Sequence, residues 1–180
     1  MKKVNIFFAE GFEEVEALTV VDILRRAGIE TWMVSITGEK MVKGSHGIKV
    51  EMDKTFNVVA DADAIVLPGG MPGTLNLKAH EGLKKLINEY NEQGKLLCAI
   101  CAAPTVYGSM ELLRDRHATC YPGMENELDA LEALTDAVVI DDNFITSRGV
   151  GTAIEFALAI VRNLIDDVTA DKLASSIVYE

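Results

Sequence analysis

The feature that most constrains the fold of this chain is the alternation of short apolar runs with helix-length segments. Apolar runs of strand length, several of them rich in Val and Ile, are predicted at residues 4–9, 31–36, 64–67, 95–100, 137–140 and 144–146. Helical patterns are predicted at 13–27, 75–92 (in two pieces), 102–113, 151–164 and 167–177, and a hairpin at 41–52. Strands separated by helices predict a mostly parallel sheet that is covered on both faces.

The 180 residues contain no repeat, low-complexity tract or linker, so we expect one domain that spans residues 1–180. In open α/β sheets, ligands bind at the carboxyl ends of the strands. This rule directs attention to three strand ends, at residues 9–16, 67–73 and 100–104.

Charge and hydropathy narrow the classes of partner. The net charge is −11, which disfavours nucleic acid and anionic membranes, because both attract basic surfaces. No window approaches the roughly 20 apolar residues of a membrane span. The first residues lead directly into a strand pattern, which leaves no room for a signal peptide, so a cytoplasmic location is expected.

Cys101 follows the strand pattern at 95–100 and precedes two alanines and Pro104, a residue that suits the first turn of a helix. A thiol at such a turn lies near free backbone amides and the positive end of a helix dipole, which favour the thiolate. Small neighbours also suit a tight strand-to-helix elbow. The alternative is a cysteine buried only as a small apolar side chain.

The other two cysteines are expected to be structural. On a strand, residues three apart point to opposite faces, so Cys98 should pack in the core rather than pair with Cys101. Cys120, with Cys101 and a histidine, lacks the compact ligand spacing of structural zinc sites. We therefore expect no metal and no organic cofactor.

Glu16 lies in the first turns of the helix predicted at 13–27 and is followed by apolar residues. Its neighbours Glu13 and Glu14 fit the role of helix-dipole partners. A carboxyl buried without a cation tends to stay protonated and can then donate a hydrogen bond to a thiolate.

The loop Gly69-Gly70-Met71-Pro72-Gly73 follows another strand and allows the backbone to approach a ligand closely. Its amides could stabilise an oxyanion, although a simple turn has the same composition. None of the three histidines directly follows Cys101, so the sequence shows no clear histidine base.

These elements together resemble the ThiJ/PfpI superfamily, and most closely its parkinsonism-associated (DJ-type) deglycase branch. The motifs are EEVE at 13–16, LPGG at 67–70, AICAAP at 99–104 and TSRG at 146–149. The resemblance covers nearly the whole chain and implies a flavodoxin-like, class I glutamine amidotransferase-like three-layer sandwich. It also implies a homodimer.

The resemblance assigns roles to individual residues. Cys101 takes the place of the family's oxidation-sensitive nucleophile, and Glu16 that of the protonated carboxyl beside its sulfur. The amides of Gly70 and Ala102 match the anion-stabilising pocket.

Arg26 and His46 match positions that line the dimer contact near the active site in family members. Arginine is common at the position of His46.

Two departures from the family pattern bear on activity. Protease-like relatives carry a histidine directly after the nucleophile, where this chain has Ala102, so peptidase activity is disfavoured. Animal members of the branch carry a histidine just before a proline, where this chain has Tyr121 before Pro122. Tyr121 is the candidate substitute base, but a phenol with a pKa near 10 is a poor base at neutral pH.

Two functions remain open. In the first, Cys101 adds to small reactive carbonyls such as methylglyoxal, or releases glycated adducts, while Glu16 moves protons. In the second, the protein is a non-catalytic oxidative-stress sensor or protective protein in which Cys101 oxidises to the sulfinate.

Overall fold

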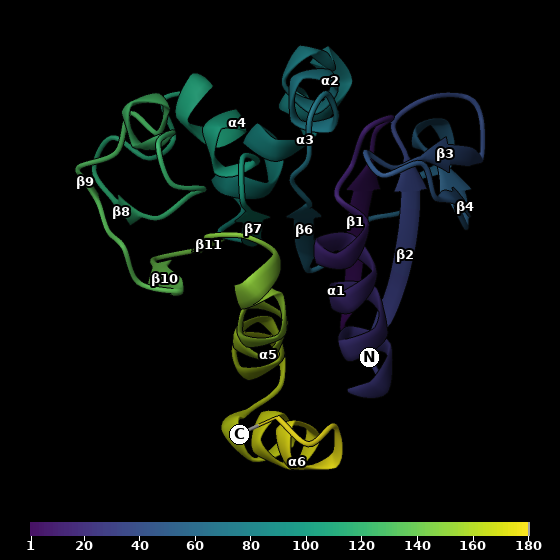
Figure 1. Cartoon of the computed structure of the whole chain (residues 1–180), viewed down its shortest axis with the longest axis vertical. Helices are drawn as coiled ribbons and strands as arrows, with labels where there is room; N and C mark the ends of the chain where they lie inside the picture. The colour runs from purple at the N-terminus through teal and green to yellow at the C-terminus, as the bar shows by residue number, and fades with distance from the viewer. Residues whose placement is uncertain (180) are drawn as a thin grey trace.

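A seven-stranded sheet with helices on both faces forms the centre of the molecule (Figure 1). The computed structural model describes residues 1–179. The strands are β1 (Lys3–Phe8), β2 (Glu30–Ser35), β3 (Met41–Lys43), β4 (Lys49–Glu51), β5 (Lys54–Thr55), β6 (Ala64–Leu67), β7 (Leu96–Ile100), β8 (His117–Ala118), β9 (Glu132–Ala133), β10 (Val138–Asp141) and β11 (Phe144–Ser147). The order in the main sheet is β10-β11-β7-β6-β1-β2-β5, with only β10 antiparallel to its neighbour.

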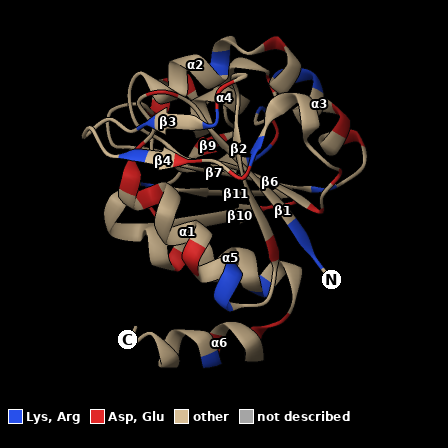
Figure 2. Cartoon of the chain, turned by 90° about the vertical axis from the view of Figure 1, so that its right-hand side faces the viewer, with Lys and Arg blue, Asp and Glu red and all other residues tan. Residues whose placement is uncertain are grey.

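The helices form the two outer layers. They are α1 (Glu14–Arg26), α2 (Gly73–Ala79), α3 (Glu81–Glu92), α4 (Pro104–Ser109), α5 (Ala153–Leu164) and α6 (Asp167–Ser176). Helices α1 and α5 cover one face of the sheet, with α6 packed beyond α5, and α2, α3 and α4 lie on the other face (Figures 1 and 2). The predicted three-layer α/β sandwich is confirmed.

Strand alternation divides the core into two parts. In β1, Ile6 and Phe8 are fully buried on the side of α1 and α5, whereas Phe7 is fully buried in the cluster on the opposite face. Because both faces of the central strands are covered, these strands read as continuous apolar runs in the sequence rather than as alternating ones.

Most of the predicted elements match to within two residues, including the hairpin, which forms β3 and β4. The helix predicted at 102–113 is wrong in extent, because α4 ends at Ser109. Glu111 adopts a left-handed conformation (φ 62°), which cannot continue an α-helix. The two-residue strands β5 and β9 were not predicted, since they are too short to carry a periodic pattern.

Three adjacent strands bring the predicted strand ends together. In the sheet, β6 lies between β1 and β7, so the segments that follow these strands meet at one edge. A backbone hydrogen bond connects the segments after β1 and β6: the amide of Glu13 donates to the carbonyl of Gly69 at 2.8 Å. The segment after β7 is tied to β11 instead, because the amide of Cys101 donates to the carbonyl of Ser147 at 3.0 Å.

Acidic and basic residues occur on both helical layers (Figure 2). Within residues 1–179, no helix is both long enough and apolar enough to span a bilayer.

Candidate active site

Cys101 is the first residue after β7 and adopts a left-handed backbone conformation, with φ at 65°. This conformation is unfavourable for a residue with a Cβ, and surrounding contacts must maintain it. The Cys101 amide donates to Ser147, and its carbonyl accepts a hydrogen bond from the amide of Tyr121 at 2.8 Å. The backbone therefore makes a sharp turn that presents the sulfur at the edge of the sheet, as in a nucleophile elbow.

Glu16 extends from the first turn of α1 towards this sulfur. The residue is 1% exposed, and its Oε2 accepts a hydrogen bond from the amide of Gly69 at 3.1 Å. Its Oε1 is buried and has no hydrogen-bond partner within residues 1–179. The structure thus brings Glu16 and Cys101 together, and leaves one carboxyl oxygen available to share a proton with a group in the site.

Burial dominates the titration of both groups. It raises the pKa of Glu16 from 4.5 to about 7; hydrogen bonding with Cys101 and Gly69 opposes this shift, and the charge of Glu13 adds to it. Burial, which is the largest cause, and the neighbouring Glu16 together raise the pKa of the Cys101 thiol from 9.0 to about 12. The raised carboxyl pKa agrees with the expectation that Glu16 holds a proton more readily than an ordinary glutamate.

The backbone amides that favour a Cys101 thiolate are opposed by stronger influences on the pKa of its thiol. Backbone amides of Ala102 and Gly70 do lower the pKa of Cys101, but burial and Glu16 outweigh them. The following helix, α4, has only six residues and so contributes a short dipole. Burial and the neighbouring Glu16 carboxyl therefore both favour the protonated form of the Cys101 thiol.

A pocket of about 380 Å³ opens above the sulfur. It is lined by Gly70, Met71, Cys101, Ala102, Tyr121, Pro122, Gly123 and Met124. The lining includes Gly70 and Ala102, whose amides the family resemblance assigned to anion binding. Within residues 1–179, it includes no Lys, Arg, Asp or Glu. The pocket suits a small molecule without a formal charge.

Tyr121 lines this pocket, but none of the three histidines does. His46 is exposed in the hairpin turn, and His80 caps α3 by accepting a hydrogen bond from the Leu83 amide. His117 pairs with Asp141 at 2.8 Å. The structure therefore places Glu16 closer to the sulfur than any histidine.

Cys98 and Cys120 are 0% and 1% exposed, whereas Cys101 is partly exposed, and all three are free thiols. Cys98 packs in the core, as predicted. The prediction that Cys98 and Cys101 point to opposite faces is wrong, because Cys101 lies beyond the last strand residue and both contact the same apolar cluster.

Arg26 and His46 do not line the Cys101 pocket. Arg26 ends α1, about 15 Å along the helix from Glu16, and pairs with Asp22 at 2.6 Å. His46 lies at the other end of α1, where its ring contacts Glu14.

Sequence reasoning missed a direct role for Gly69 and the apolar walls, Met71 and Met124. A Cβ on Gly69 would lie 2.5 Å from the Cβ of Cys101 and 2.7 Å from Oε2 of Glu16, so only glycine fits between them. The LPGG motif could have signalled this close approach. The two methionines had no signal, because their position depends on loops that meet only in the fold.

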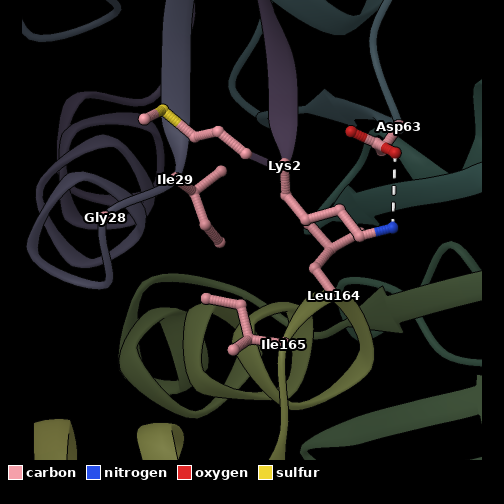
Figure 3. Close-up of a pocket in the computed structure, with 7 residues that line it drawn as sticks. Lys2, Gly28, Ile29, Asp63, Leu164 and Ile165 are labelled. Carbon is pink, nitrogen blue, oxygen red and sulfur yellow. Dashed lines mark hydrogen bonds and ion pairs between the residues drawn. The ribbon is translucent and has the colours of Figure 1, made fainter.

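A hollow larger than the Cys101 pocket lies at the opposite end of the sheet. It has a volume of about 610 Å³ and is lined by residues near Lys2, Ile29 and Leu164, with Lys2 paired to Asp63 at 3.3 Å (Figure 3). No cysteine or histidine is among its lining residues within the described chain. The Cys101 pocket is therefore the better candidate for catalysis.

A three-layer α/β sandwich with a mostly parallel sheet, in which a cysteine at a left-handed strand-to-helix turn lies beside a buried glutamate, defines the class of this protein. Comparison with known protein families shows which family of this class the chain belongs to. The DJ-1/PfpI family matches residues 2–163, and the chain belongs to this family.

Its relatives include Protein DJ-1 homolog B of Arabidopsis thaliana, 37% identical over 98% of this chain. This chain covers 41% of that protein and 46% of the Arabidopsis homolog A, and so spans less than half of either. The Caenorhabditis elegans protein named glutathione-independent glyoxalase DJR-1.2 is 35% identical over 86% of this chain and 84% of its own length.

Solved structures agree in fold. Oxidised Toxoplasma gondii DJ-1 superposes with a TM-score of 0.96 at 34% identity, covering 99% of both chains. Drosophila melanogaster DJ-1beta superposes with a TM-score of 0.94 at 34% identity, and the match covers 99% of this chain and 98% of that one.

The raised pKa of Glu16 predicts a pH-dependent stability. The folded pKa, about 7, exceeds the unfolded value of 4.5, so the folded state binds more protons between these values. The contribution of Glu16 to the free energy of unfolding is then greatest below about pH 4.5. It falls as the pH rises towards 7, by about 2–3 kcal/mol between pH 5 and pH 8.

Urea unfolding at pH 5 and pH 8 measures this loss. Glu16→Gln should remove most of it, whereas Glu155→Gln, at an exposed position, should retain the wild-type loss. If the free energy of unfolding changed equally with pH in wild type and Glu16→Gln, the assignment of the raised pKa to Glu16 would be contradicted.

Proposed function

We propose that the protein is a cysteine-dependent enzyme that converts small reactive carbonyls such as methylglyoxal, or releases glycated adducts, without a cofactor. The contact between Glu16 and Cys101 in a partly open pocket carries the proposal. The glyoxalase name of the C. elegans relative supports it. Because the chemistry needs a reduced thiol, and the cytoplasm keeps thiols reduced, we propose that the protein is cytoplasmic.

The first step is addition of sulfur to the aldehyde. Ionised Glu16, with a pKa of about 7, accepts the thiol proton while the S–C bond forms, and returns the proton to the carbonyl oxygen. The product is a hemithioacetal. The amides of Gly70 and Ala102 stabilise negative charge during the addition.

The second stage moves a proton without net oxidation. Glu16 removes the hydrogen from the former aldehyde carbon, and the hydroxyl proton on that carbon passes to the neighbouring ketone oxygen. Glu16 then delivers its proton to the adjacent carbon, which converts the hemithioacetal to a thioester of a 2-hydroxy acid. Water then hydrolyses the thioester, releases the hydroxy acid and restores the thiol. Tyr121 at the pocket wall can donate a hydrogen bond to the substrate oxygen.

The pocket also indicates which substrates fit. Its walls are formed by Met71, Met124, Pro122 and the ring of Tyr121. An uncharged carbonyl with a small apolar substituent matches these walls, because a charged group would be desolvated without a partner.

Methylglyoxal consumption with lactate formation tests the proposal. Wild type should turn over, Cys101→Ser should show no activity above background, and Glu16→Gln should be slower by about 10²–10⁴-fold, the usual contribution of a general base. Cys120→Ala, which removes a thiol that is 1% exposed, should retain the wild-type rate. A wild type no faster than Cys101→Ser would exclude catalysis of this kind.

A second candidate function is oxidative sensing or protection by Cys101. Two observations favour it. Within residues 1–179, no histidine lines the pocket. Cys101 is partly exposed, whereas Cys98 and Cys120 are buried. Peroxide would oxidise the sulfur in two steps, each reducing one peroxide to water, and the protonated Glu16 would donate to the resulting sulfinate.

Mass spectrometry after mild peroxide treatment tests this alternative. Cys101 should gain two oxygen atoms before Cys98 or Cys120 gains any, and Glu16→Gln should change the yield of sulfinate at Cys101. Comparable oxidation of all three cysteines would rule out a dedicated sensor.

We also propose that two copies of the chain associate as a homodimer, as the family resemblance implies. Val15 and Ile48 support this, since both are apolar and are 50% and 53% exposed. Val15 follows Glu14, whose carboxylate accepts hydrogen bonds from the amides of His46 and Ile48. Sedimentation equilibrium should give twice 19.6 kDa, and Val15→Glu with Ile48→Glu should give a monomer. A wild-type mass of one chain would refute the dimer.

A further inference from the structure

The two carboxyl oxygens of Glu16 face different parts of the site. Oε2 accepts the hydrogen bond from the amide of Gly69, and a Cβ on Gly69 would lie 2.7 Å from it. Oε1 faces Gly149 instead, because a Cβ on Gly149 would lie 3.7 Å from this oxygen. In the proposed reaction, the water that hydrolyses the thioester still needs a place beside a base, and the second oxygen indicates where that place is.

Tyr121 bounds the space beside Gly149 from another side. A Cβ on Gly149 would lie 3.7 Å from Cδ2 of the Tyr121 ring. Apart from the two neighbours of Gly149 in the chain, no further heavy atom within residues 1–179 would come within 4 Å of that Cβ. Because Tyr121 also lines the pocket above Cys101, the space beside Gly149 adjoins the place where the substrate binds.

Neither the backbone conformation nor the packing requires glycine at position 149. Its φ of 162° is extended backbone, which any residue adopts. The two contacts that an added Cβ would make, both at 3.7 Å, are ordinary van der Waals separations. Gly69 differs, because a Cβ there would lie 2.5 Å from the Cβ of Cys101. At position 149, the contribution of glycine is therefore the free space between Glu16 and Tyr121.

Hydrogen bonds to Thr152 fix Gly149 on both sides of its Cα. The amide of Gly149 donates to Oγ1 of Thr152 at 3.2 Å, and its carbonyl accepts a hydrogen bond from the amide of Thr152 at 2.9 Å. Oγ1 of Thr152 also lies 2.7 Å from Oγ of Ser147, the last residue of β11. The turn is thus tied to the sheet, and the space beside Gly149 keeps its position relative to Glu16.

Oε1 of Glu16 has the properties of a base that can hold a water molecule. Glu16 is 1% exposed, and Oε1 has no hydrogen-bond partner within residues 1–179. A buried polar atom without a partner is costly, so a molecule that donates a hydrogen bond to Oε1 is stabilised there. Water is about the size of a methyl group and fits the space that an alanine side chain would fill.

We propose that the space beside Gly149 holds the water that hydrolyses the thioester, with Oε1 of Glu16 as its base. This inference rests on the proposed function. The water oxygen bonds to the carbonyl carbon of the thioester while one of its protons passes to Oε1. The bond between that carbon and the sulfur of Cys101 then breaks, and the proton on Glu16 passes to the sulfur. The hydroxy acid leaves, the thiol is restored, and Gly149 acts as a positioning residue.

Gly149→Ala tests the proposal, because its methyl group takes the place of the water at ordinary contact distances. With methylglyoxal, the variant should still form the thioester on Cys101. It should hydrolyse that thioester about 10²-fold more slowly than wild type, since the water loses its place beside the base. Rapid quenching followed by intact-mass measurement gives both rates. Hydroxylamine distinguishes the thioester from the hemithioacetal of equal mass, because it converts only the thioester to a hydroxamate.

Gly151→Ala is the matched control, because a Cβ added to Gly151 in the same turn would meet nothing within 4 Å. This variant should hydrolyse the thioester at the wild-type rate. The pH dependence of wild-type hydrolysis gives a second measurement that needs no variant. The rate should rise with pH through about 7 as Glu16 ionises, because only the carboxylate can accept a proton from water.

Hydrolysis by Gly149→Ala at the wild-type rate would overturn the proposal, as would a wild-type hydrolysis rate that does not change between pH 5 and pH 8. Equal slowing of thioester formation and hydrolysis would also overturn it, because the methyl group would then have displaced Glu16 from Cys101. If wild type formed neither thioester nor lactate, the proposed function itself would fail, and the wild-type measurement alone reveals that outcome.

Discussion

The structure depends on the burial of one carboxyl group, that of Glu16, against the sulfur of Cys101. Within residues 1–179, neither group pairs with a basic residue, and the only backbone hydrogen bond to the carboxyl comes from the amide of Gly69. Such a contact costs solvation energy, and the surrounding sheet must maintain it. The order β1-β6-β7 does this, because it places the start of α1, the LPGG loop and the elbow side by side.

This contact determines the chemistry that the site can perform. Burial moves the carboxyl pKa to about 7, the range in which a group exchanges protons efficiently at neutral pH, and holds the sulfur as a thiol until a base removes its proton. In the proposed reaction, the carboxyl takes the role that a histidine has in many cysteine enzymes. A single pair can therefore support both proposed functions, carbonyl conversion and oxidation of Cys101, which differ in what reacts with the sulfur.

Much of this arrangement was predictable from the sequence. The alternation of strands and helices indicated the layers, and small residues around Cys101 indicated the elbow. The direction of the Cys101 pKa was not predictable, because it depends on how deeply Glu16 and the thiol are buried together. The approach of Gly149 to Glu16 and Tyr121 was also beyond sequence reasoning, since it depends on how the segments after β1, β8 and β11 meet.

The titration of Glu16 itself tests the central claim most directly. Carbon-13 NMR of protein labelled at glutamate carboxyls, with Glu16→Gln to assign the resonance, measures its pKa in the folded state. The account predicts a midpoint near 7, well above the ordinary 4.5. A midpoint near 4.5 would mean that the carboxyl is not held against the sulfur as described, and would contradict its role as the base.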